Sequence, residues 1–122
     1  MLDQLSQKFA ALADPTRRAM LTRLSKGQAS VSEVAKPFLK RMSMPAVTKH
    51  MKVLERAGLV TKTKDAQRRL CDLNPDGFKD TVAFLEKYRQ LCEESLDRLG
   101  EYLESITNQS NQANRKKTDD RQ

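Results

Sequence analysis

The residues best suited to binding or chemistry lie in one short stretch, SMPAVTKHMKVLERAGLV, which runs from position 43 to position 60. It holds the only histidine of the chain, His50, next to Thr48 and Lys49. Hydroxyl, ammonium and imidazole groups can form hydrogen bonds to base edges, and cations also attract phosphate. A catalytic base is the competing interpretation of His50, but no obvious nucleophile or orienting carboxylate lies close to it in the sequence. Nucleic-acid contact or packing along a helix is therefore the better hypothesis.

The charge around this stretch is strongly positive. The chain has a net charge of +7, and the segment 36–69 contains ten Lys or Arg against Glu55 and Asp65, which leaves a slight negative excess elsewhere. Charges that only serve solubility are spread along a chain, whereas a basic block is typical of a polyanion partner. A membrane surface is a poorer candidate than nucleic acid, because the block is not one amphipathic helix with a wide apolar face.

The overall composition excludes several other classes. At 122 residues the chain is long enough for one domain, and it contains neither a membrane-spanning apolar run nor a signal-peptide pattern, so we expect a cytoplasmic protein. Cys71 and Cys92 are not part of a CxxC motif, and we expect both to be free thiols. No glycine-rich phosphate loop, paired-carboxylate site or catalytic triad can be assembled, so an enzyme is the weakest candidate.

Apolar spacing and capping residues predict three short helices before the basic stretch. Leu2, Leu5, Phe9 and Leu12 form one stripe of the first helix. A second helix starts at Asp14-Pro15, a favourable N-cap followed by proline at the first helical position, and ends at Lys26-Gly27. Ser32 is the expected cap of a third helix, which Pro37 makes short or bent.

The stretch 43–60 is itself predicted to be a helix, which Ser43 caps and Gly58 ends. Its buried stripe contains Val47, Met51, Leu54 and Ala57. The outward face then carries Pro45, Thr48, Lys49, Lys52 and Arg56. Two extended runs, 59–64 and 68–73, follow around Asp65-Ala66-Gln67 and predict a basic β-hairpin.

The last predicted element is a long helix from Pro75 onward, whose apolar residues include Leu85, Cys92, Leu96 and Leu99. Some 28 residues would extend about 42 Å, more than a small core can cover, so part of the apolar face should contact another chain. Gly100 should weaken its last turn. The segment 107–122 has no apolar periodicity and is expected to be a disordered polar tail after a domain spanning 1–106.

The order of these elements is that of a winged helix-turn-helix: mainly α-helical, with a small β-hairpin beside the last of the short helices. Such a helix can enter the major groove while the hairpin reaches neighbouring phosphates. The predicted DNA-binding residues are Ser43, Met44, Pro45, Thr48, Lys49, His50 and Lys52 from the helix, with Lys62, Lys64, Arg68 and Arg69 from the hairpin. Arg17 and Arg18 either touch phosphate or flank the second helix.

The segment from Phe9 to Leu103 resembles the ArsR-type winged-helix transcriptional repressors. The resemblance rests on ALADPTRRAMLTRL (11–24), VSEVAKPF (31–38), MSMPAVTKHMKVLERAGLV (42–60) and RRLCDLNP (68–75). It implies a homodimer that binds double-stranded DNA at an inverted-repeat operator and that dimerises through its first and last helices. The interface would then contain Leu2, Leu5, Phe9, Leu85, Cys92, Leu96 and Leu99.

The chain departs from the family pattern in two places. Its third helix has no Cys or His and its last helix has no His, so it resembles a metal-independent branch with no cofactor and an unknown inducer. At the hairpin turn, Ala66-Gln67 stands where Gly-Arg is common, which argues against minor-groove insertion. Two alternatives stay open: a winged helix that binds an acidic protein, and a repressor that responds to thiol oxidation through Cys92.

Overall fold

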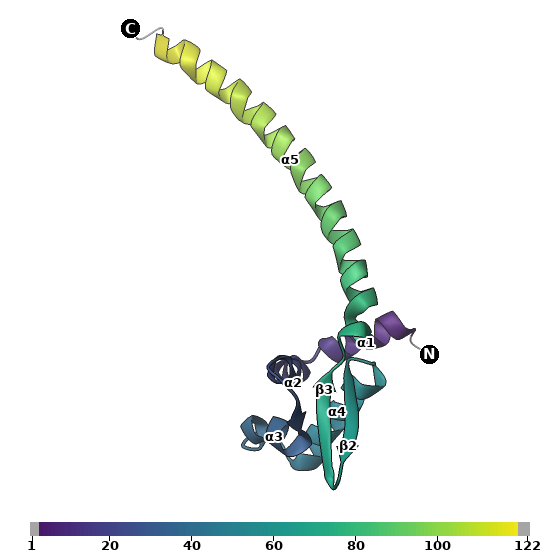
Figure 1. Cartoon of the computed structure of the whole chain (residues 1–122). Helices are drawn as coiled ribbons and strands as arrows, with labels where there is room; N and C mark the ends of the chain where they lie inside the picture. The colour runs from purple at the N-terminus through teal and green to yellow at the C-terminus, as the bar shows by residue number, and fades with distance from the viewer. Residues whose placement is uncertain (1–2, 120–122) are drawn as a thin grey trace. The chain divides into compact units, whose positions relative to one another are not determined.

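The computed structural model describes the backbone of residues 3–119 and the side chains of residues 3–110. The chain divides into two compact units, 1–83 and 84–122, so the predicted domain 1–106 extends across both. The helices and strands are α1 (Gln4–Leu12), α2 (Pro15–Ser25), β1 (Ala29–Ser30), α3 (Val31–Ala35), α4 (Met44–Arg56), β2 (Val60–Asp65), β3 (Arg68–Leu73) and α5 (Lys79–Asp119) (Figure 1). Short 3-10 turns follow α3 at Lys36–Phe38 and precede α5 at Pro75–Phe78.

The predicted caps of α2 and α4 are confirmed. The Asp14 side chain accepts a hydrogen bond from the backbone N–H of Arg17, and the Ser43 side chain accepts one from that of Ala46. Each cap satisfies a backbone donor that has no partner inside its helix, and each is followed by a proline in the first turn. Gly58, at φ +81°, ends α4 as predicted.

The third helix begins two residues earlier than predicted. Its cap is Ser30, whose hydroxyl accepts a hydrogen bond from the backbone N–H of Glu33 at 3.2 Å, so the assignment of Ser32 was wrong. The reason is the short strand β1, which pairs Ala29 and Ser30 with β3 and holds Ser30 in the extended geometry of a cap. Pro37 limits the helix as expected, because the chain tightens into a 3-10 turn at that point.

The hairpin forms, and it belongs to a three-stranded antiparallel sheet in the order β1-β3-β2. In the hairpin Val60 lies opposite Leu73 and Asp65 opposite Arg68, so the connection has only two residues, Ala66 and Gln67. Figure 1 shows β2 and β3 running side by side to this turn. We call the hairpin, residues 60–73, the wing.

The core of the first unit lies where α2, α3, α4 and the sheet meet. Met20, Val47, Met51, Leu54 and Leu59 are fully buried, so the predicted stripe of α4 packs inward. Cys71 is also fully buried, and burial raises the pKa of its thiol. The outer face of α4 is thereby left for other contacts.

Helix α5 is longer than the sequence indicated. Its backbone stays helical through Gly100 and past Ile106 to Asp119, where a disordered tail was expected. The extension contains no proline or glycine, and an existing helix is lengthened at little cost by residues such as Gln, Ala, Arg and Lys. Within the described part of the chain, no helix is long and apolar enough to cross a membrane.

Candidate nucleic-acid interface

The outer face of α4 is a shallow, partly cationic surface. Met44, Pro45, Thr48, Lys49 and Lys52 together line a concave patch of about 510 Å³. Among the described residues, no acidic side chain pairs with Lys49 or Lys52. The structure therefore groups five of the seven helix residues predicted to contact DNA.

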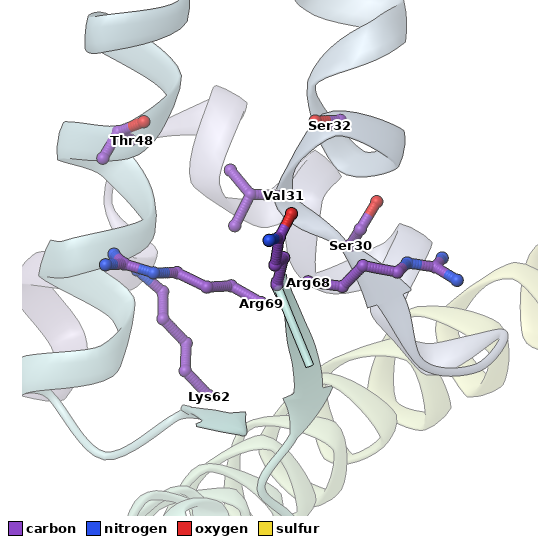
Figure 2. Close-up of a pocket in the computed structure, with 8 residues that line it drawn as sticks. Ser30, Val31, Ser32, Thr48, Lys62, Arg68 and Arg69 are labelled. Carbon is purple, nitrogen blue, oxygen red and sulfur yellow. The ribbon is translucent and has the colours of Figure 1, made fainter. Parts of the chain in front are cut away.

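A second cavity, of about 480 Å³, opens between α3, α4 and the wing. It is lined by Ser30, Val31, Ser32, Thr48, Lys62, Gln67, Arg68 and Arg69. Figure 2 shows Arg69 extending toward α4 and Arg68 extending toward α3. Because Thr48 lines both cavities, the outer face of α4 and the inner side of the wing form one continuous surface.

The four predicted wing cations have different partners. Lys62 Nζ lies 3.3 Å from Oε2 of Glu55 on α4, and Arg68 Nη2 lies 3.2 Å from Oε1 of Glu33 on α3. By contrast, Lys64 and Arg69 have no acidic partner within the described part of the chain. Among the described wing residues, Lys64 and Arg69 are therefore the two cations without a competing carboxylate.

His50 is not among the residues that line these two cavities. It is half-buried, and its Nδ1 lies 3.3 Å from Nη1 of Arg17. The same arginine donates hydrogen bonds to the backbone oxygens of Ala11, at 2.7 Å, and Ala10, at 3.0 Å. Arg18 donates similarly to the oxygen of Leu12. Both arginines thus hold the last carbonyls of α1, which supports the flanking role and not phosphate contact.

Four residues that line the cavity between α3, α4 and the wing were not predicted: Ser30, Val31, Ser32 and Gln67. One signal for the first three was available, because Ser30 and Glu33 have the spacing of a capping box and mark the true start of α3. Nothing in the spacing of the wing residues indicated which of them would face the cavity.

The residues predicted for dimerisation fall on two helices. On α5, Leu85, Leu96 and Leu99 are more than half exposed, and Cys92 is an exposed thiol. On α1, Leu5 and Phe9 are half-buried, whereas Leu2 lies outside the described residues. An apolar row of this kind on a helix is unusual for a surface that meets only water.

No metal centre is formed by the residues that the structure describes, since no three His, Cys, Asp or Glu side chains come together in a suitable group. The metal-independent assignment stays a prediction. So does the absence of a catalytic role.

Comparison with known proteins identifies the fold and the family. Residues 12–63 match a family described as a helix-turn-helix domain. The chain is 40% identical to the HTH-type transcriptional regulator Rv2034 of Mycobacterium tuberculosis over 80 residues. This alignment covers 66% of this chain and 73% of the relative. Over 81 residues the chain is 26% identical to the transcriptional repressor SdpR of Bacillus subtilis, covering 66% and 88% of the two chains.

Solved structures agree with this relationship. A crystal structure of an ArsR family transcriptional regulator is 44% identical, with a TM-score of 0.68 over 75% of this chain and 98% of the other. The fold is also that of a homodimeric winged helix-turn-helix DNA-binding domain from Mycobacterium bovis, which is 21% identical, with a TM-score of 0.56 over 79% and 84% of the chains. The chain therefore belongs to the ArsR family of winged helix-turn-helix transcriptional regulators.

Proposed function

We propose that this protein is a homodimeric repressor that binds an inverted-repeat operator and blocks transcription by occupying a promoter. The observation that carries the DNA contact is the outer face of α4, where Lys49 and Lys52 lie beside Thr48 without acidic partners among the described residues. Unpaired cations on the outer face of a helix attract phosphate without first having to break an ion pair.

Within this face, position along α4 assigns a role to each side chain. Thr48 and Lys49 would reach base edges in the major groove, and Met44, 36% exposed in the first turn, would approach a thymine methyl group. Ser43 and the first backbone amides would hold a phosphate at the positive end of the helix. His50 would support α4 through Arg17 and not read bases.

The dimer part of the proposal rests on α5. Leu85, Leu99 and Leu103 each expose more than half of their surface, and burying such side chains against a second copy would be favourable. The homodimeric structure from Mycobacterium bovis supports this assembly by analogy of fold. A two-fold dimer places its two recognition helices on half-sites about 34–36 Å apart, which predicts an inverted repeat.

Repression is supported by the Bacillus subtilis relative, which is named a transcriptional repressor. A dimer seated across a promoter would exclude polymerase from the same DNA. The cytoplasmic location expected from the sequence remains part of the proposal.

The test is selection from a random-sequence DNA pool at two salt concentrations, with wild type, Lys49→Ala and a matched control. Lys79→Ala is a suitable control, because that exposed lysine pairs with Asp76 and is not among the residues that line the α4 face. We expect wild type and the control to select an inverted repeat. Lys49→Ala should select the same repeat more weakly or with less sequence preference. Sequence-blind binding by wild type would overturn the proposal and favour a winged helix that binds an acidic protein.

One observation keeps a thiol-responsive version of this function open. Cys92 is exposed and lines a mainly apolar patch with Tyr88, Leu91, Ser95 and Leu96. If this patch meets the same patch of a second copy, with the two Cys92 Cα atoms within about 7 Å of each other, oxidation would join the chains by a disulfide. Non-reducing electrophoresis of oxidised wild type and Cys92→Ser, combined with DNA affinity, decides the matter. Absence of a cross-link and of any change in affinity would end this version.

A further inference from the structure

The wing carries four cations, but its strand register separates them into groups. Lys62 lies opposite Cys71, and Lys64 lies opposite Arg69. Residues directly opposite each other share a face, and side chains alternate between the two faces along a strand. Lys62, Lys64, Arg69 and Cys71 therefore lie on one face of the wing, and Arg68 lies on the other. Cys71 is fully buried, so this is the face turned toward the core, and it continues past the core toward the turn.

Lys64 and Arg69 are therefore like charges placed directly opposite each other. Cross-strand pairs of the same charge repel, and in the described part of the chain no carboxylate offsets this pair. Arg69 also extends toward α4, on the side where Thr48 lines the shared surface (Figure 2). An anion held between the two cations would remove the repulsion, and a DNA phosphate beside α4 is the anion that the proposed function supplies.

Lys62 is placed very differently. Its side chain is only 14% exposed, and its ammonium group pairs with Glu55 in the last turn of α4. The pair connects β2 directly to the helix that carries Thr48 and Lys49. A phosphate could reach this lysine only in competition with a carboxylate that is already beside it.

Arg68 is held from the other side of the wing. Glu33 on α3 accepts a hydrogen bond from Arg68 and also lies 3.8 Å from Nη2 of Arg23 on α2. One carboxylate thus joins three elements: α2, α3 and β3. Exposed ion pairs add little to global stability, so the effect to expect is on the orientation of the hairpin.

We propose that Glu33 and Glu55 are positioning residues of the DNA interface. They hold the wing against α3 and α4 through Arg68 and Lys62, and they leave Lys64 and Arg69 to contact phosphate. The inference rests on the DNA binding proposed above, and it revises the expectation that all four wing cations serve the same purpose.

The first experiment measures the salt dependence of binding by the full chain to the duplex selected by wild type. Each lost phosphate contact should reduce the slope of log affinity against log salt by about 0.9. Lys64→Ala and Arg69→Ala should each show that reduction, which is about a 3.5-fold smaller loss of affinity for a fourfold rise in salt. Lys62→Ala, Arg68→Ala and the control Lys79→Ala should leave the slope unchanged.

The second experiment tests the positioning role by charge exchange. Glu55→Lys and Lys62→Glu should each reduce the discrimination between the selected duplex and a scrambled duplex by about threefold or more, and the double variant should restore it. Glu33→Arg with Arg68→Glu forms a second such set, made in an Arg23→Ala background because Arg23 pairs with the same carboxylate. A structural loss unrelated to the ion pair would not be rescued by exchanging the charges.

The outcomes separate the two proposals. If wild type selects an operator but all four wing variants lower the slope equally, or if the double variants fail to restore discrimination, the positioning role is overturned while DNA binding stands. If wild type shows no sequence preference, both proposals fall. Reduced slopes for Lys64→Ala and Arg69→Ala alone, together with rescue by exchange, would support the inference.

Discussion

The ammonium nitrogen of Lys8 lies 2.7 Å from Oδ1 of Asp80, although 72 residues separate them in the sequence. The pair joins α1 to the first turn of α5, where a carboxylate is also favoured by the helix dipole. The two partners differ in exposure: the Lys8 side chain is 11% exposed and that of Asp80 is 43% exposed. Removing one partner should therefore lower the free energy of unfolding by a different amount than removing the other.

Asp80→Asn should destabilise the protein more than Lys8→Met at neutral pH. The first change leaves a nearly buried ammonium group without its anion, whereas the second leaves a carboxylate that water can still solvate. Urea unfolding of the two variants gives the comparison. Equal losses, or a larger loss for Lys8→Met, would contradict the asymmetry.

The same pair predicts how stability changes in acid. The hydrogen bond from Lys8 holds the pKa of Asp80 below its usual value of 3.8. A carboxyl group with a lowered folded pKa contributes stability that is fully present above its unfolded pKa and is lost as the pH falls through the folded pKa. Asp80→Asn should make the decline in unfolding free energy below about pH 5 shallower. Asp65→Asn, at the exposed wing turn, is the matched control.

The wing turn contains a residue in an unfavourable conformation. Ala66 has φ +56°, the left-handed region that glycine tolerates and alanine resists, and it is the one non-glycine residue at positive φ in the described chain. Ala66→Gly should stabilise the protein by about 1 kcal/mol in chemical unfolding. Gln67→Gly has no such strain to relieve and should not stabilise; equal gains from both would count against this explanation.

Local patterns predicted the parts of the fold that local interactions determine. The caps by Asp14 and Ser43 and the end of α4 at Gly58 all depend on residues a few positions apart. The stripe of α4 followed in the same way from helical spacing. Helical spacing alone therefore places Thr48 and Lys49 on the outer face of α4, where the structure has them.

The errors came from contacts between distant segments. The Ser30–Glu33 spacing was a local signal for the start of α3, but the strand β1 that holds Ser30 in cap geometry pairs with β3, about 40 residues further on, and no local pattern contains it. The contact of His50 with Arg17, 33 positions earlier, also lay beyond local patterns, while DNA contact by His50 stays a prediction. One local hint was available, because His50 is three residues after Val47 and four before Leu54, at the edge of the buried stripe. Likewise, the pairing of Glu33 and Glu55 with the wing depends on packing that spacing does not reveal.

Gly77 is required by a close backbone approach. A Cβ atom at this position would lie 1.9 Å from the backbone oxygen of Gly58, to which Asn74 also donates a hydrogen bond. Gly77→Ala should therefore destabilise by about 1–3 kcal/mol or more, because the backbone has to shift. Gly100→Ala is the contrasting variant: open space surrounds that position, and alanine should stabilise the helix by about 1 kcal/mol. Thermal unfolding of both variants tests whether the loss of stability comes from the close backbone approach at Gly77 and not from replacing a glycine as such.

The exposed apolar row on α5 predicts which substitution should abolish the dimer. Leu99 is 52% exposed and lies seven residues after Cys92 and seven before Ile106, so the three share one face of the helix. Leu99→Asp would place a charge at the centre of the proposed interface and should convert the dimer to monomer in sedimentation equilibrium. DNA affinity should fall with it, because a monomer binds only one half-site. Glu101→Ala, two residues away and exposed, should change neither property. A monomeric Leu99→Asp variant that keeps full operator affinity would show that α5 assembly and DNA binding are not linked.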